Sequence, residues 1–409
     1  MAIEKNIIAP DGEDLTKERS FEDVENEELF DAMIGETEEN VTMMEDGSAI
    51  LGEPDEELAE SDFEDNLAEL IEESELSVIA SNLLDGIEKD KSSREDWEKT
   101  YTDGLKYLGM KFDEQRSQPF EGASNVTHPL LGEAVTTFQA QAYKELLPSN
   151  GPVKTQVIGL YDSIKETQAQ RVQDFMNYQI VHVMEEFDEE LDQMLFYLPL
   201  AGSAFKKVYY DDNLGRAVSK FIAPEDLIVP YYTTDLESCQ RITNVIKMSE
   251  NEVKKLQASG FYRMLDLQNS QGENQFSEIK EEINKLSGMQ PTYDSDDLVV
   301  LYEVHCNLDL EGFEDTDEEG DFTGIKLPYI VTIDSNNQEI LSIRRNYKEE
   351  DTLKNKVEYF VHFKFLPGLG FYGFGLTHMI GGLSKASTSI LRQLIDAGTL
   401  ANLPAGFKT

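Results

Sequence analysis

The C-terminal segment Leu366–Thr409 places the tightest constraint on what this chain can fold into. Its apolar residues recur at three- and four-residue steps, which predicts a long helix with one apolar face. The recurring residues are Leu376, Met379, Ile380, Leu383, Ala386, Ile390, Leu391, Leu394 and Ile395. Asp396-Ala397-Gly398 is typical of a helix end, and Leu403–Gly406 is expected to turn the chain away. A two-faced helix needs a surface to pack against, and that surface lies upstream, on another copy of the chain, or in sequence beyond residue 409.

The chain is strongly acidic, with 81 Asp and Glu residues against 35 Lys and Arg residues and a formal net charge of -46. This charge argues against a surface that grips phosphates, so we expect no tight nucleic-acid binding. The excess is concentrated in residues 1–75, which form the first of four predicted segments. A segment rich in like charge buries too little apolar surface to fold, so most of Met1–Asp55 is predicted to be disordered.

Residues 76–200 form a second segment, which is predicted to be helical. Amphipathic stripes predict helices at Leu76–Ile87, at Trp97–Leu108 with a cap at Ser92 or Ser93, at Leu131–Leu146, and as a pair across Ser163–Leu198 that Pro199 stops.

Residues 201–365 form a third segment, in which the period changes to two. We predict a hairpin of Phe205–Tyr210 with Ala217–Ile222, a capping box at Ser249 to Glu252, and strands at Leu298–Leu308, Tyr329–Asp334, Ile340–Arg344 and Val357–Phe365. Residues 366–409 are the fourth segment, a glycine- and aromatic-rich elbow followed by the long helix. The predicted fold class is α+β.

Three blocks, in this order, resemble the portal proteins, or head-to-tail connectors, of short-tailed bacteriophages. They are Gln115–Gly159, which contains PFEGASNVTHP, Ile222–Tyr262, which begins IAPEDLIVPYYT, and Gly370–Phe407, which begins GFYGFGLTHM. The resemblance runs from about Ile87 to the end of the sequence. Members of that family are usually longer, so we expect this chain to be the N-terminal part of one.

The resemblance implies a function without catalysis or cofactor. Portal subunits form a ring, typically of about twelve copies, at one vertex of the capsid. Terminase drives double-stranded DNA in through the ring, and tail adaptor proteins later receive it. The expected partners are further copies of the chain, capsid protein, terminase, tail adaptors and passing DNA bound without sequence specificity. The protein is expected in the virion after assembly in the host cytoplasm.

The same resemblance assigns a role to the last helix. Leu376–Ala397 resembles part of the stem that surrounds the channel, and the α+β region before it resembles the outward wing. Four residues on the polar face are therefore candidates for a channel lining or a subunit interface: Ser384, Lys385, Thr388 and Arg392. Lys385 and Arg392 would contact phosphates in a channel, or acidic groups of a neighbouring subunit at an interface.

A different class of function is suggested by Gly368-Leu369-Gly370-Phe371-Tyr372-Gly373, a G-x-G-x-x-G sequence between a predicted strand and a helix. A nucleotide-binding enzyme places such a loop within a parallel βαβ unit, with an acidic residue after the second strand. Here the acid about twenty residues on, Asp396, falls at the predicted helix end. The alternative is that the glycines allow a tight turn, from which Phe371, Tyr372 and Phe374 wedge into a neighbour.

Other chemistry has little support in the sequence. The five histidines lack metal-ligand spacing, and Cys239 and Cys306 form no CxxC pair, which fits a reducing compartment. His305 and Cys306 are expected on opposite faces of a strand. The pairs Lys206-Lys207, Lys254-Lys255 and Arg344-Arg345 are predicted to be solvated. No apolar run is long enough for a membrane span, and the N-terminus lacks the apolar core of a signal peptide, so we expect no membrane contact.

Overall fold

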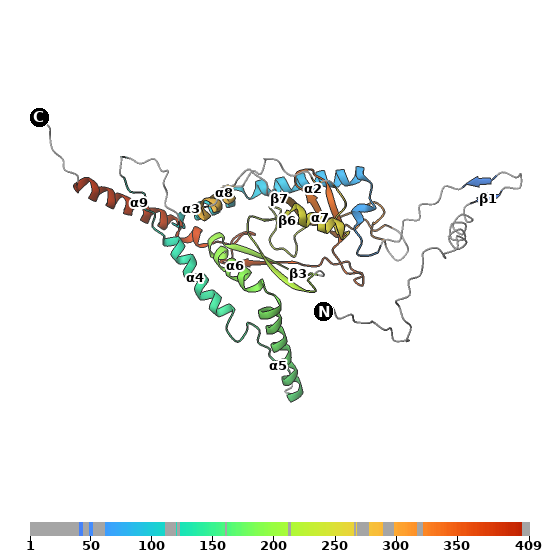
Figure 1. Ribbon diagram of the computed structural model, residues 1–409, viewed down its shortest axis with the longest axis horizontal. Helices are drawn as coiled ribbons and strands as arrows, with labels where there is room; N and C mark the ends of the chain where they lie inside the picture. The colour runs from blue at the N-terminus through green and yellow to red at the C-terminus, as the bar shows by residue number, and fades with distance from the viewer. Residues whose placement is uncertain are drawn as a thin grey trace, which may run out of the picture. The chain divides into compact units, whose positions relative to one another are not determined.

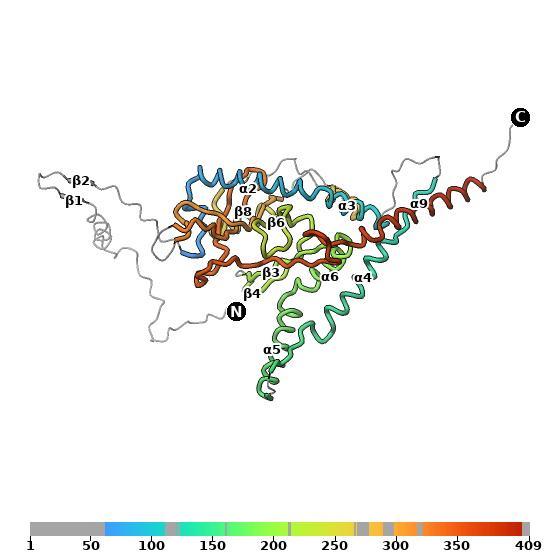
Figure 2. The backbone as a smooth tube through the Cα atoms, turned by 180° about the vertical axis from the view of Figure 1, so that it is seen from behind, coloured from blue at the N-terminus to red at the C-terminus, as the bar shows by residue number. Residues whose placement is uncertain are grey.

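A computed structural model of the chain is shown in Figures 1 and 2. It describes residues 41–43, 49–51, 62–110, 120, 123–159, 162–211, 214–265, 267, 278–288, 298–316 and 322–402. The chain divides into two units, Met1–Asp62 and Phe63–Thr409. In the first unit, β1 (Val41–Met43) pairs antiparallel with β2 (Ala49–Leu51). Apart from this hairpin, the disorder predicted for most of Met1–Asp55 concerns residues outside the described ones.

The second unit begins before the end of the segment predicted as residues 1–75. A short helical turn, η1 (Leu67–Glu69), buries Leu67 completely. Asn66 caps this turn, and its Nδ2 also donates to Leu341 O at 3.1 Å. Its Oδ1 accepts from Ile343 N at 2.9 Å. The last residues of the acidic segment are therefore part of the folded unit, because one asparagine side chain ties them to a strand.

The helical part of the second unit contains most of the predicted helices. The bounds are α2 (Glu73–Ser93), α3 (Glu95–Tyr107), α4 (Leu130–Leu146), α5 (Ser163–Tyr178), the π-helical turn η2 (Gln179–Val183) and α6 (Phe187–Ala201). The cap predicted at Ser92 or Ser93 is wrong, because α2 continues through both residues and Arg94 separates it from α3. Pro199 does not stop α6 either. It lies in the last turn, where the missing N–H costs one bond, and the helix ends at Gly202 with φ of 85°.

Two antiparallel sheets follow, which confirms the predicted α+β class. The three-stranded sheet has the order β10-β3-β4 and the five-stranded sheet has the order β5-β6-β7-β8-β9. The bounds are β3 (Ser203–Asp211), β4 (Arg216–Ile222), β5 (Leu227–Ile228), β6 (Arg241–Ser249), β7 (Leu298–Leu308), β8 (Leu327–Asp334), β9 (Ile340–Arg345) and β10 (Phe360–Lys364). The hairpin and four later strands were predicted, whereas β5 and β6 were not.

Three further helices complete the unit: α7 (Glu250–Ala258), α8 (Glu278–Ser287), which was not predicted, and α9 (Leu376–Asn402). The predicted capping box at Ser249 and Glu252 is present at the start of α7. The helix end predicted at Asp396–Gly398 is wrong, because α9 continues to Asn402 and accommodates Gly398 in its interior. The predicted turn at Leu403–Gly406 lies outside the described residues. No helix in the described ranges is both long and apolar enough to cross a membrane.

The five-stranded sheet lies between two helices. On one face, Leu76, Leu83 and Ile87 of α2 pack against residues of β7 to β9. On the other face, Val253 of α7 packs against Leu301 and neighbouring residues. Alternate residues of a strand point to opposite faces, so β7 contributes to both clusters. Figures 1 and 2 show α2 running along this sheet and α3 continuing toward the elbow that precedes α9.

A buried ion pair connects the two sheets. Lys207 of β3 donates from Nζ to both carboxylate oxygens of Glu303 of β7, each at 2.6 Å. His305 Nε2 lies 2.7 Å from Glu303 Oε1. Burial by itself raises the pKa of Glu303, but the charge of Lys207 and the contact with His305 lower it to about 2. The carboxylate is therefore ionised at neutral pH, and its charge is compensated by the other sheet.

We predict that Lys207→Ala lowers the free energy of unfolding by about 3–5 kcal/mol, because it leaves the Glu303 carboxylate buried without its cationic partner. Urea denaturation measures the loss. The matched control is Lys220→Ala. Lys220 lies on β4 directly opposite Lys207, and its side chain is exposed, so the free energy of unfolding should change by no more than about 0.5 kcal/mol. Equal effects of the two substitutions would show that the ion pair does not hold the sheets together.

Candidate functional site

The elbow between β10 and α9 lies directly against the C-terminal end of α6. Gly373 N donates to Ser203 Oγ at 2.8 Å, and Thr377 Oγ1 donates to Leu200 O at 2.9 Å. A Cβ added to Gly373 would lie 2.4 Å from Gly202 O, so a side chain at this position would displace backbone. The start of α9 is therefore held to α6 by close backbone packing.

The G-x-G-x-x-G sequence Gly368–Gly373 forms part of this elbow. The strand before it, β10, pairs antiparallel with β3, whereas a dinucleotide site is built on a parallel βαβ unit. The later acid, Asp396, accepts a hydrogen bond from Ser124 N at 2.7 Å. A Cβ added to Gly370 would meet no atom within 4 Å, while one added to Gly373 would meet the backbone of Gly202, the residue that caps α6. The described contacts of this sequence are those of a packed turn.

Two of the three aromatic side chains of the elbow pack within the chain. Phe371 is buried in the cluster between the two sheets. Tyr372 stacks on Trp97 of α3 with ring centroids 4.3 Å apart. Phe374 remains 36% exposed. The neighbour into which Phe371 and Tyr372 were predicted to wedge is therefore the chain's own folded unit.

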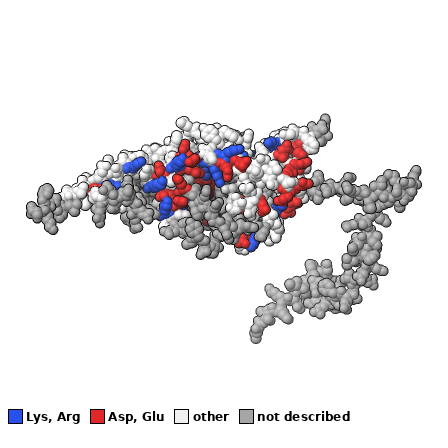
Figure 3. All heavy atoms as spheres, turned by 90° about the horizontal axis from the view of Figure 1, so that it is seen from above, with Lys and Arg blue, Asp and Glu red and all other residues white. Residues whose placement is uncertain are grey.

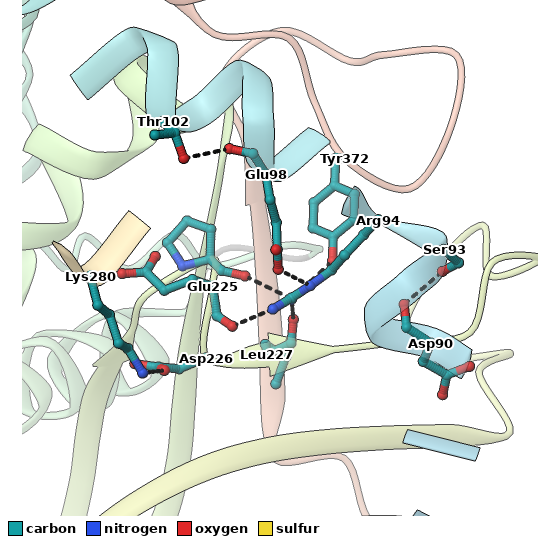
Figure 4. Close-up of polar contacts among 11 residues, drawn as sticks. Asp90, Ser93, Arg94, Glu98, Thr102, Glu225, Asp226, Leu227, Lys280 and Tyr372 are labelled. Atoms are coloured by element: carbon teal, nitrogen blue, oxygen red, sulfur yellow. Dashed lines mark hydrogen bonds and ion pairs between the residues drawn. The ribbon is translucent and has the colours of Figure 1, made fainter. Parts of the chain in front are cut away.

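Arg94, between α2 and α3, joins the elbow to the rest of the unit (Figure 4). Its Nη1 donates to Leu227 O at 2.7 Å, and its Nη2 donates to Glu225 O at 2.5 Å. Its Nε donates to Glu98 Oε1 at 2.8 Å, and Nη1 also donates to Tyr372 Oη at 3.4 Å. A guanidinium suits this place because its rigid fork of N–H donors reaches several acceptors at once. One buried side chain thus contacts α3, the segment before β5 and the elbow.

The carboxyl group of Glu225 lies in the same buried network. Its Oε2 has no hydrogen-bond partner among the described residues. Burial, and then the neighbouring Asp226, raise the pKa of Glu225 to about 7, although Lys280 and Arg94 act in the opposite direction. The folded unit therefore holds a proton on Glu225 at pH values where the unfolded chain has lost it.

We predict that Glu225→Gln removes a pH dependence of stability. Because the folded-state pKa is raised from 4.5 to about 7, the wild-type free energy of unfolding falls as the pH rises through that window. At about pH 8 the variant should be more stable than wild type by about 1–3 kcal/mol, and below about pH 4.5 the two should be equal. Denaturant titrations at both pH values measure this. Glu88→Gln, at an exposed position of α2, is the control that should follow the wild-type profile.

The polar face of α9 contacts the chain's own segment before α4. Arg392 Nε donates to Val126 O at 2.6 Å, and its Nη2 donates to Thr127 Oγ1 at 3.0 Å. Thr388 Oγ1 accepts from His128 N at 3.1 Å. The segment Ala123–Pro129 therefore lies along this face and uses its polar groups.

These contacts change the assignment of the predicted channel or interface residues. The four were Ser384, Lys385, Thr388 and Arg392. Ser384 is buried, Thr388 and Arg392 are half-buried against the preceding segment, and only Lys385 is exposed. Periodicity predicted two faces, but the covered side of the helix cuts across them, because Lys385 of the predicted polar face is exposed and Leu391 of the predicted apolar face is half-buried.

The apolar face of α9 is exposed instead. We call the apolar stripe the row formed by Met379, Leu383, Ala386, Ile390 and Leu394, which recur at three- and four-residue steps. Ile390 is 65% exposed and Leu394 is 70% exposed. At the start of the helix, Leu376 and Ile380 contact the cluster of α3, α4 and α6. Figure 3 shows few charged atoms at its left, where α9 lies.

The exposed stripe is also poor in acids. Asp396 is the single acidic residue between Leu376 and Asn402, in a chain where 81 of 409 residues are acidic. That carboxylate already accepts the Ser124 N–H. Lys385 and Arg392 are the basic residues of the helix, so its formal charge is slightly positive. An aliphatic surface without negative charge on an acidic protein is typical of a contact site.

The other basic residues singled out in the sequence are mostly not solvated, contrary to the prediction. Lys206 is buried, and Lys207 forms the ion pair with Glu303. Arg344 and Arg345 donate to the carbonyls of Glu64 and Phe63, at 2.6 and 2.8 Å. Lys254 and Lys255 are exposed, as predicted. Their long stems allow such side chains to cover apolar surface, which sequence spacing does not reveal.

The predicted divergence of His305 and Cys306 is confirmed. His305 contacts Glu303 on one face of β7, whereas Cys306 belongs to the core beneath α2. Within the described ranges, no group of three or more His, Cys, Asp and Glu side chains is placed to hold a metal ion.

No family model matches the chain, and no curated protein matches it.

Sequence reasoning did not find Arg94 or Glu225. Both lie in short connections between elements, where no periodicity exists, and the carbonyls that Arg94 binds come from a segment more than a hundred residues away.

We predict that Gly373→Ala lowers the free energy of unfolding by about 1–3 kcal/mol, because the added Cβ overlaps Gly202 O and must push the elbow from α6. Gly370→Ala, in the same turn, has open space around the added atom and should be close to neutral. Thermal or urea unfolding of both variants tests the pair. A larger loss from Gly370→Ala than from Gly373→Ala would contradict the packing role of the elbow.

Proposed function

We propose that this chain is a subunit of a phage portal ring, through which terminase packages DNA and from which the DNA later leaves through the tail. The observation that carries this proposal is the exposed apolar stripe of α9. The three sequence blocks that resemble portal proteins support it, because the last of them contains the elbow and this helix. The proposed protein has no catalytic role, and its partners are capsid protein, terminase and tail adaptors.

Removing the apolar stripe from water lowers the free energy, and this favours assembly. From Met379 to Leu394 the helix rises roughly 23 Å, and its aliphatic side chains along this length are mostly in solvent. Monomeric soluble proteins rarely expose contiguous apolar patches of more than a few hundred Å². Covering such a surface contributes about 25 cal/mol for each Å² of apolar area. A neighbouring subunit in a ring would provide that cover.

The charge of the chain is compatible with a conduit for DNA. Each fixed cation along a channel adds a binding site for phosphate and slows a moving duplex. Of the two basic residues of α9, Arg392 donates to the chain's own Val126, and Lys385 is exposed. A helix of this kind would present at most a sparse ring of cations to passing DNA.

The alternative, a nucleotide-binding enzyme that uses Gly368–Gly373, has a weaker basis. Its loop precedes a helix, as required, but the strand before it is antiparallel to its neighbour and the acid that would bind a ribose is engaged by Ser124. Isothermal titration with NAD and with ATP tests it directly. Saturable binding of either nucleotide by the monomer would favour the enzyme.

We predict that the protein, expressed with any sequence that its reading frame carries after Thr409, forms closed rings with a central hole and about twelve-fold symmetry in negative-stain electron microscopy. Leu394→Asp should shift the population to monomers, because it places a charge in the contact and adds to the repulsion between acidic copies. The matched control is Leu353→Asp, at a 79% exposed leucine outside α9, which should leave the rings intact. Wild-type protein that stays monomeric at every concentration tested would overturn the proposal.

A further inference from the structure

We propose that the copy-to-copy contact pairs two different surfaces: the apolar stripe of α9 on one copy and the outer face of α5 and η2 on the next. This inference rests on the proposed function and adds the identity of the two surfaces that meet. We call α5 together with η2, Ser163–Val183, the arm.

The arm has an apolar face that the described residues leave exposed. None of its residues is buried. Ile164 is 66% exposed, Phe175 is 61% exposed, and Val172 and Tyr178 are each at least half exposed. These positions fall on one side of the helix by their spacing. A helix of this length gains little stability from its own hydrogen bonds, so an apolar face left in water is a surface for a partner.

The opposite side of the arm is bound to the chain's own preceding loop. Val153 N donates to Asn177 Oδ1 at 2.9 Å, and Asn177 Nδ2 donates back to Val153 O at 3.1 Å. Thr155 N donates to Gln173 Oε1 at 3.1 Å. The arm thus has the same organisation as α9: polar groups hold a loop of the same chain, and the apolar face remains open.

Electrostatics favours a second copy of this chain as the partner. Two copies that each carry a formal charge of -46 repel one another, so they can approach only where acids are sparse. The arm has Lys165 and Arg171 against Glu166 and Asp174, a formal charge of zero. The helix α9 is slightly positive. These two apolar surfaces are therefore suited to meet in a contact between acidic chains, and neither offers the charge that a polyanion or a basic protein would need.

The two surfaces belong to separate parts of the folded unit. The elbow fixes the start of α9 beside α3, α4 and α6, while the arm follows the far end of α4, which spans roughly 25 Å. Figures 1 and 2 both show α5 at the end of α4 that is remote from α9. A contact between unlike surfaces is heterologous, and repetition of one heterologous contact closes into a ring when its rotation divides a full turn.

Mixing two assembly-defective variants tests the pairing. Leu394→Asp damages the stripe and leaves the arm intact, whereas Phe175→Asp damages the arm and leaves the stripe intact. Each variant alone should be monomeric in mass photometry. An equimolar mixture should form heterodimers and stop there, because one intact stripe binds one intact arm and the two remaining surfaces are both damaged. Phe322→Asp, at a 73% exposed phenylalanine outside both surfaces, is the control that should assemble like wild type.

The other outcomes have distinct meanings. A mixture that stays monomeric, or rings that persist in Phe175→Asp while Leu394→Asp is monomeric, would overturn the pairing and leave the portal proposal standing. In that case the stripe contacts another stripe, a further part of the protein, or a different protein. Failure of the wild-type protein to assemble would overturn the portal proposal and the pairing with it. Fluorescence of Trp97, the one tryptophan in the chain, reports whether each variant is folded.

A cross-linking measurement guards against variants that fail to fold. Ile390→Cys and Phe175→Cys in one chain should give a ladder of covalent oligomers with a bismaleimide. Ile390→Cys alone should give none, because two stripes do not meet. Cys239 and Cys306 are buried and should not react. A ladder from Ile390→Cys alone would show a symmetric contact between stripes and would count against the pairing.

Discussion

The buried guanidinium of Arg94 is the interaction on which the arrangement of the folded unit depends. It contacts carbonyls of the segment that leads into the five-stranded sheet, a carboxylate of α3 and the phenol of the elbow. A buried charge with these partners is stable only if all of them are present, so the sheet, the helices and the elbow are fixed together. The close approach of Gly373 to Gly202 adds a second constraint at the same place. Together they determine the direction in which α9 leaves the unit.

Much of the fold follows from the sequence, and the reasons for the failures are physical. Period two predicted β7, β8 and β9 because these strands are long and bury one face or both. The strand β6 was missed because its apolar residues are interrupted by Asn244 and Lys247, and it is recognised as a strand only by its pairing with β7. Pro199 and Gly398 predict helix ends from the sequence, but a helix tolerates either residue when its neighbours are packed or its end is near.

The candidate site was also predicted only in part. Spacing predicted a long helix with an apolar and a polar face, but the covered side of α9 includes residues of both, such as Leu391 and Arg392. Spacing could not show that Val126 and its neighbours form hydrogen bonds with polar residues of α9, because these bonds join segments more than 250 residues apart. As a consequence, much of the predicted polar face is covered by the chain itself, whereas the apolar stripe is open. Long-range hydrogen bonds, rather than local pattern, decide which side of an amphipathic helix is free.

The contact between Gly373 and Gly202 also has a mechanical meaning. Where two helices meet through long side chains, rotamer changes absorb small displacements before the backbone moves. At the elbow, backbone packs directly on backbone, so no side chain can absorb a displacement by changing its rotamer. Thr377 Oγ1 adds a hydrogen bond to Leu200 O close by. The junction is therefore stiff, and a push along α9 passes to α6 as a rigid displacement.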